Sequence, residues 1–501
     1  MNKPRLLWSL CAVLVLNLFA WLGGCDVSLF SDPSVFADSG PRGTTAGIQS
    51  VSQSRLVKRS QKSSNSSSPP TSPSTSSTTG TSPSSSTTTS SGTTTVGSSQ
   101  TTQSSPTTTT VTVQSPTTAA TLITDLAVYP EPPLPSLLQA GAQTIDPTFG
   151  TKILRLTDGA DGNSGVQVQY AYWPVFNVDS TRIHVVGTYE ATRSVFYKLD
   201  PNTTTASNQI VLRTPPPSGW LMERSDMIWS GSDHDVIYGH NEVHKLWAYN
   251  VATNSYSLIK DFSNQVLPNG GLYQMSKSLQ DDVFAFSLTD SSGNPAGFLV
   301  WKRSTNQILL RQVVANINEV QVDKSGQFLS VVFNGNNNQV WTLATGRFEN
   351  LTWGVDGFAH YDSGQGTLLT VGFSQKDLRY RQLATPHVYA SLLPGYISYA
   401  LQSDHFSMLA DNERWGLISR YSLSGGPVRD PLDNEVFQIA TDGSNRVRRI
   451  AHHRSVAVTY EAQPKANISR DGRFVAFTSN WGRAGGRLDV YVTTLPAAPF
   501  N

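Results

Sequence analysis

Cysteine is almost missing from this sequence. Of 501 residues only Cys11 and Cys25 are cysteines, and both lie near the N-terminus. Disulfides, thiolate metal sites and a cysteine nucleophile are therefore excluded from the rest of the chain. A strong net charge is missing too: residues 126–501 contain 30 Lys and Arg and 32 Asp and Glu, a net charge of −2. Such a domain has no general electrostatic footprint for nucleic acid, so we expect no nucleic-acid partner.

Apolar and charged residues are scarce between residues 61 and 120. This segment contains 20 Ser and 20 Thr, and Lys62 is its only charged residue. It cannot bury enough apolar surface to offset the entropy lost on ordering. We therefore predict that residues 25–125 form a disordered Ser/Thr/Pro-rich tether and that residues 126–501 form the folded domain. A flexible chain of about 100 residues spans on the order of 50–60 Å on average.

The N-terminus has the pattern of an export signal. Lys3 and Arg5 precede an apolar run from Leu6 to Leu22, which is near the lower limit for crossing a bilayer. The following Leu-Gly-Gly-Cys25 resembles the lipobox of bacterial lipoproteins. The resemblance implies a signal peptide over residues 1–24, a lipid on Cys25 and a bacterial cell-envelope location, periplasmic or surface-facing. An uncleaved membrane helix is the alternative.

Helical periodicity is nearly absent from the folded part. Short apolar runs such as FLSVVF (328–333) are bounded by Gly, Asn, Asp and Ser, which is typical of β-strands. Segments 177–187, 321–333 and 467–479 repeat a strand–turn–strand pattern. Their turns contain Ser325-Gly326 and Asp471-Gly472, residues that adopt positive φ at low cost.

These units recur along the chain at roughly 40–60 residues, the spacing of propeller blades. We place their starts near Ala171, Asp226, Tyr273, Glu319, Phe358, Asp404 and Pro464. The sequence therefore predicts an all-β, seven-bladed β-propeller that is monomeric, with six or eight blades as the alternatives. A lone strand at residues 151–157 is expected to form the outer edge of the last blade and so to close the ring.

Segment 468–492, with its ISRDGRF and FTSNWG motifs, resembles the final blade of TolB-like and oligogalacturonate lyase-like propellers of the bacterial envelope, and segments 146–159 and 431–455 extend the likeness. Enzymes of that family cleave pectic uronides by β-elimination, with a histidine base and a divalent metal held by histidines and a glutamine. The resemblance implies that His360 is the base and that His405 and Gln463 are metal ligands, with Mn²⁺ or Ca²⁺ as the candidate ion. Beside Gln463, however, the chain reads Gln-Pro-Lys-Ala-Asn without a histidine, so we expect this metal site to be incomplete.

Charged residues at the unit starts form the second group of candidates. Lys465 or Arg414 could neutralise a uronate carboxylate, and Glu319, Asp404 and Arg224 could bind ligand at the channel mouth. Ordinary surface charge explains them equally well. His452 and His453 lie among arginines and are interpreted as a surface basic cluster, and most tryptophans are expected to pack between blades.

Three functions follow from these observations. The first is a membrane-tethered propeller that binds an acidic oligosaccharide or cell-wall glycan at its channel mouth. The second is a divergent β-eliminating lyase, and the third is a scaffold that docks another envelope protein. The sequence leaves open whether the chain is an enzyme.

Overall fold

The computed structural model describes residues 122–162, 165–188, 194–211, 227–240, 243–334, 337–372, 376–395, 402–422, 428 and 430–495. The predicted signal peptide, Cys25 and the tether up to residue 121 lie outside these ranges, as does Arg224. None of the residues described forms a helix that is both long and apolar enough to span a membrane.

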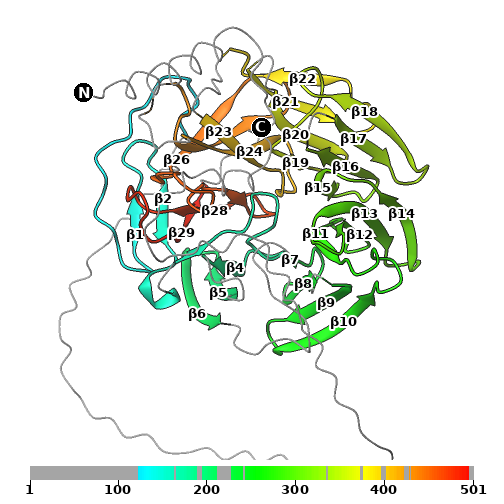
Figure 1. Ribbon diagram of the computed structural model, residues 1–501. Helices are drawn as coiled ribbons and strands as arrows, with labels where there is room; N and C mark the ends of the chain where they lie inside the picture. The colour runs from blue at the N-terminus through cyan, green and yellow to red at the C-terminus, as the bar shows by residue number, and fades with distance from the viewer. Residues whose placement is uncertain are drawn as a thin grey trace, which may run out of the picture. The chain divides into compact units, whose positions relative to one another are not determined.

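The described chain folds into seven antiparallel sheets that follow one another around a ring (Figure 1). We number them blades 1 to 7. Blade 1 contains β3 (Val166–Gln167), β4 (Arg182–Gly187), β5 (Ser194–Asp200) and β6 (Thr205–Val211). Blade 2 contains β7 (Ile228–Trp229), β8 (Val236–His240), β9 (Lys245–Asn250) and β10 (Ser255–Asp261). Blade 3 contains β11 (Leu272–Lys277), β12 (Val283–Thr289), β13 (Pro295–Lys302) and β14 (Gln307–Val313). The only helical element among the described residues is a 3₁₀ turn, η3 (Gly159–Asp161).

Blades 4 to 6 repeat this four-stranded order, and β15 and β19 lie nearer the centre of the ring than the later strands of their blades (Figure 1). Blade 4 contains β15 (Ile317–Val322), β16 (Phe328–Phe333), β17 (Asn337–Thr342) and β18 (Arg347–Thr352). Blade 5 contains β19 (Tyr361–Ser363), β20 (Thr367–Gly372), β21 (Asp377–Gln382) and β22 (Tyr389–Leu392). Blade 6 contains β23 (Gln402–Ser407), β24 (Trp415–Ser422), β25 (Glu435–Ala440) and β26 (Val447–His452). The predicted seven-bladed β-propeller is thus confirmed.

Blade 7 closes the ring by joining both ends of the described chain. Its order from the inner strand is β27 (Asn467–Ile468), β28 (Phe474–Ser479), β29 (Asp489–Thr494), β2 (Lys152–Arg155) and β1 (Gln143–Ile145). β2 pairs with β29 through Leu154 and Val492, as closure requires. The expectation that this strand forms the outer edge is wrong, because β1 pairs with its free side and adds a fifth strand.

The repeated turns owe their shape to short side chains that bond the backbone. In blade 4 the Asp323 carboxylate accepts from the amides of Gln327 and Phe328 while Gly326 takes φ 72°. In blade 7 Gly472 also takes φ 72°, and Ser469 Oγ accepts from the Phe474 amide. Both hairpins therefore use the turn chemistry that the sequence predicted.

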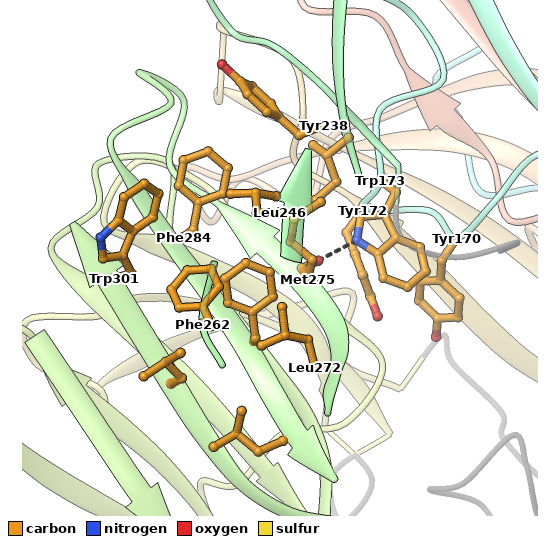
Figure 2. Close-up of a cluster of buried hydrophobic side chains, with 14 of the residues drawn as sticks. Tyr170, Tyr172, Trp173, Tyr238, Leu246, Phe262, Leu272, Met275, Phe284 and Trp301 are labelled. Carbon is orange, nitrogen blue, oxygen red and sulfur yellow. Dashed lines mark hydrogen bonds between the residues drawn. The ribbon is translucent and has the colours of Figure 1, made fainter. Parts of the chain in front are cut away.

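The core lies between the blades. Figure 2 shows the cluster shared by blades 1 to 3, where Trp173, Phe262 and Trp301 are buried. Trp173 Nε1 donates to the carbonyl oxygen of Met275 at 2.8 Å, so the indole is buried with its polar atom satisfied. Trp229, Trp415 and Trp481 are buried as well, which confirms tryptophan as a packing residue. Trp220 lies outside the described residues.

An extended segment that the sequence did not predict covers blades 6 and 7. We call residues 122–139 the N-terminal strap. Ile123 pairs with Arg449 at the edge of β26. Side chains of the propeller donate to strap carbonyls: Arg449 to Ala127, Arg454 to Pro132 and Trp481 to Pro135.

The strap overturns the interpretation of His452 and His453 as a surface basic cluster. Both histidines are 0% exposed. His452 packs against Phe149, with ring centroids 4.8 Å apart, and His453 Nε2 lies 3.0 Å from the carbonyl oxygen of Arg420. A basic run at the edge of a sheet is solvated only when nothing covers that edge, and here the strap does.

Candidate active site in the central channel

Side chains on or next to the inner strands of five blades meet in one group. His360 directly precedes β19, His405 lies on β23, and Gln463 and Lys465 precede β27. Glu319 lies on β15, and Tyr170 and Tyr172 follow β3. The rings of His360 and His405 stack with centroids 5.3 Å apart, and Tyr170 meets His405 edge-on at 4.9 Å. We call this group the histidine site.

His360 is held as a neutral imidazole with one free basic nitrogen. Its Nδ1 lies 2.8 Å from the backbone carbonyl oxygen of Asp404, and a carbonyl can only accept, so Nδ1 carries the proton. Nε2 is then the unprotonated nitrogen. Burial lowers the pKa of His360, and the bond to the Asp404 carbonyl opposes this only in part. The backbone takes φ 44°, a strained region for a non-glycine residue.

His405 is buried more deeply and is also neutral. Its Nε2 lies 2.8 Å from Gln463 Oε1, while its Nδ1 is buried without a hydrogen-bond partner. Burial holds the pKa of His405 well below its usual range, and the neighbouring His360 and Lys465 lower it further. His405 is therefore uncharged at neutral pH and stacks on Tyr421 at 5.2 Å.

Lys465 brings an ammonium group to this site. The residue is only 1% exposed, and its Nζ lies 3.7 Å from the centre of the Tyr460 ring. A cation over an aromatic face at that distance is held by the ring quadrupole. Lys465 also has positive φ, at 45°, so two of the candidate residues sit on strained backbone.

Glu319 is a half-buried carboxyl among tyrosines. Burial raises the pKa of Glu319 to about 8; contact with the Tyr172 hydroxyl opposes that shift and the charge of Asp362 adds to it. Glu319 Oε1 and the Tyr361 hydroxyl are buried without a hydrogen bond of normal geometry. Buried polar atoms are usually paired, so two open ones in a channel indicate a place for water or ligand.

The donors present do not make a good site for the manganese or calcium ion that the family resemblance implies. His405 Nε2 faces Gln463, and the ammonium of Lys465 is close enough to lower the pKa of His405. Across the described residues no group of three or more His, Cys, Asp or Glu side chains converges as a metal site would require. The incompleteness of the metal site stays a prediction.

A second hollow opens at the other ends of the inner strands. It has a volume of about 70 Å³ and is lined by residues that end or follow these strands, together with aromatic rings of blades 1 and 2; they include Trp173, Phe176, Trp229, Lys277, Lys324, Asp362, Ser363 and Arg470. Tyr172 lines this cavity and also contacts Glu319, so it separates the two ends. We call this the strand-end cavity.

The other predicted site residues lie elsewhere. The Asp404 carboxylate is buried in an ion pair with Arg420, 3.2 Å from Nη1, so its backbone carbonyl rather than its side chain serves the histidine site. Arg414 is exposed in the turn between β23 and β24, next to Glu413, which pairs with Lys324 at the strand-end cavity. The structure does not bring Arg414 together with His360. Arg224 falls outside the described residues.

The remaining histidines do not form a site. His184 is buried in blade 1 between Gln169 and Ser194, as a packed sheet residue. His240 is buried, whereas His234 is more than half exposed beside Asp179 and Asp235. His387 pairs with Asp356 at 2.5 Å on the outside of blade 5.

Sequence reasoning missed the tyrosines that line the histidine site and the carboxyl of Asp362 beside them. Tyr361 follows His360 in the chain, so a search for polar aromatics at the unit starts would have found it. Burial raises the pKa of Asp362 to about 7. That shift depends on packing across blades, which a single sequence does not reveal.

Comparison with solved structures finds oligogalacturonate lyases. One, an oligogalacturonate lyase in complex with manganese, has 13% sequence identity and a TM-score of 0.53, over 72% of this chain and 99% of that chain. Another, from Vibrio parahaemolyticus, has 11% identity and a TM-score of 0.51, over 71% and 97%. No family model matches the sequence, and no curated protein matches it. At these identities the likeness establishes a lyase-like propeller fold and leaves the activity to be argued from the site.

Proposed function

We propose that this chain binds an acidic oligosaccharide at the histidine site and cleaves it by β-elimination without a resident metal ion. The observation that carries the proposal is the hydrogen bond from His360 Nδ1 to the Asp404 carbonyl, because it leaves Nε2 as an unprotonated base. The fold that this chain shares with oligogalacturonate lyases supports the choice of a uronate substrate.

The chemistry needs a base and a positive charge in one place. The proton to be removed lies on the carbon next to the uronate carboxylate, and a cation on that carboxylate makes it more acidic. His360 supplies the base. Lys465 supplies the positive charge within the group formed by His405 and Tyr460.

The test uses the full-length chain with short oligogalacturonates as substrates and a chelator in the buffer. Elimination creates a carbon–carbon double bond conjugated with the carboxylate, so ultraviolet absorbance rises as product forms. We expect a rise for the natural chain and none for His360→Ala. His387→Ala, an exposed histidine on blade 5, is the matched control and retains the natural rate. Equal rates for all three proteins would contradict the role of His360.

Binding without turnover is the second candidate, and one feature favours it. Ala466 and Asn467 follow Lys465 where the lyase-type sequences carry histidines, so an ancestral metal-assisted reaction could have been lost while the pocket remained. Calorimetric binding of oligogalacturonates with no absorbance change would support this reading. The lipid anchor at Cys25, the envelope location and the scaffold role stay predictions, as does the likeness to TolB-like propellers.

A further inference from the structure

β-Elimination needs an acid as well as a base. When the proton next to the carboxylate leaves, the bond to the neighbouring glycosidic oxygen breaks, and that oxygen departs as an alkoxide unless it is protonated. Positioned general acids typically contribute about 10²–10⁴-fold to such steps. The proposed function so far names His360 and Lys465 and leaves this second proton transfer without a donor.

Glu319 is placed to supply it. It lies on β15 in blade 4, the blade next to His360, and its carboxyl contacts Tyr172 and Tyr361. Tyr361 follows His360 directly in the chain. Glu319 Oε1 is buried without a hydrogen bond of normal geometry. Tyr172 meets Tyr170, which meets His405, and the His405 ring stacks on His360, so the carboxyl and the base belong to one group of contacting residues.

Burial and the charge of a second acid, Asp362, favour the protonated form of Glu319. The hydroxyls of Tyr172 and Tyr361 contact the carboxyl and oppose this only in part. None of the interactions that act on it comes from a lysine or arginine of the described chain. Burial raises the pKa of Glu319 to about 8, so the carboxyl keeps its proton at neutral pH.

The other candidates for a proton donor fit less well. Burial raises the pKa values of Tyr172 and Tyr361 well above the ordinary value for tyrosine, which makes their hydroxyls poor acids. Asp362 is committed, because its carboxylate accepts from Gln321 Nε2 at 3.0 Å and from the amides of Ser363 and Met408. His405 is neutral and buried.

We propose, resting on the proposed function, that Glu319 is the proton donor to the leaving glycosidic oxygen in the elimination that His360 begins. His360 Nε2 takes the proton from the carbon next to the carboxylate, and that electron pair forms the new double bond. The carbon–oxygen bond breaks, and its oxygen takes the proton of Glu319. The step ends with a positive His360 and a negative Glu319, and one proton moved from solvent to Glu319 and one from His360 to solvent restore the site.

The test compares two substrates with the full-length chain, Glu319→Gln and His360→Ala. One is an oligogalacturonate, whose leaving group needs a proton. The other is a synthetic uronate with nitrophenoxide at the same carbon, a leaving group stable without one. We expect Glu319→Gln to lose about 10²–10⁴-fold on the first substrate and to stay within a few-fold of the natural rate on the second. His360→Ala loses both activities.

Four outcomes are informative. The split between substrates, together with loss of the alkaline limb of the pH profile in Glu319→Gln, supports the proposal. Equal losses on both substrates would make Glu319 a binding or structural residue and overturn it, and so would unchanged rates on both. If the natural chain turns over neither substrate, the acid role is also overturned, and calorimetry then reports separately whether the acidic oligosaccharide binds. If the Glu319→Gln chain does not fold, Glu319→Asp takes its place. This variant keeps a carboxylic acid, so it should keep part of the activity on the oligogalacturonate.

Discussion

The two ends of the central channel contain similar polar residue types, but these are paired at one end and partly unpaired at the other. At the strand-end cavity each cation has an acidic partner: Lys277 lies 2.6 Å from Asp281, Lys324 lies 2.8 Å from Glu413, and Arg470 Nε lies 3.0 Å from Asp411. At the histidine site Glu319 Oε1, the Tyr361 hydroxyl and His405 Nδ1 are buried without a hydrogen bond of normal geometry.

This difference separates stability from function. Two of these ion pairs, Lys324 with Glu413 and Arg470 with Asp411, join different blades, and all three are already formed in the folded chain without a ligand. Unpaired polar atoms cost free energy in the folded chain and become satisfied only when something else arrives. The strand-end cavity, where the cations are paired, is therefore the structural end, and the histidine site is the candidate active site.

The largest expected effect is on stability, at the strand-end cavity. Asp281→Asn leaves the buried ammonium of Lys277 without its counter-charge and weakens the contacts of Asp281 with Ser230 and Gly231. Breaking a buried pair in this way costs about 3–5 kcal/mol of unfolding free energy. Urea unfolding measures it, with the more exposed Asp282→Asn as control, and turnover per folded molecule should not change. A loss of turnover with intact stability would erase the distinction between the two ends.

A smaller effect is expected at the histidine site from Lys465→Met. The side chain keeps its contact with Tyr460 but loses its charge. A charged hydrogen bond contributes about 1.5–3 kcal/mol, so affinity for the acidic oligosaccharide should fall roughly 10- to 100-fold. Calorimetry measures it, and Lys302→Met on blade 3 is the control. Unchanged affinity would remove Lys465 from the carboxylate contact.

The pH dependence of stability gives a subtler test. The pKa of Glu319 is raised to about 8 in the folded chain from an ordinary value of 4.5. Between these values the folded state binds a proton that the unfolded state has lost, so this residue lowers the unfolding free energy as pH rises through that window. Glu319→Gln should gain stability relative to the natural chain from pH 5 to pH 8, as urea unfolding at each pH would show. A constant difference between the two proteins would mean that Glu319 is ionised throughout.

The smallest expected effect is that of metal ions. The donors at the histidine site do not converge on an ion. Mn²⁺ or Ca²⁺ should therefore leave the melting temperature and the oligogalacturonate turnover unchanged, and a chelator should lower neither of them. Differential scanning calorimetry with and without each ion is the measurement. A metal-dependent rise in melting temperature that His405→Ala abolishes would restore a metal site.

The fold was accessible from the sequence, and the state of the site was not. Short β-branched runs and Gly326 or Gly472 in the turns act locally, so periodicity reveals the blades. The N-terminal strap could not be predicted, because its own residues show no hydrophobic periodicity. It is held by propeller side chains such as Arg449 and Trp481. The same cover buries His452 and His453, whose run of basic neighbours had indicated an exposed loop.

At the site itself the sequence identified residues but not their protonation. His360, His405, Gln463 and Lys465 were found at the unit starts, and the structure groups them. That His360 Nε2 is the free nitrogen depends on a carbonyl contributed by another blade. That Glu319 keeps a proton depends on its burial among residues of other blades and on the charge of Asp362 in blade 5. Such long-range pairings follow from the closed ring and leave no local pattern.

The most direct test of the central claim is the absorbance of the unsaturated product when the full-length chain acts on oligogalacturonates in the presence of a chelator. We expect steady product formation that His360→Ala abolishes and His387→Ala leaves intact. A trace that stays flat with the chelator and rises when Mn²⁺ is restored would overturn the metal-free role of the histidine site, because the reaction would then depend on a bound metal ion.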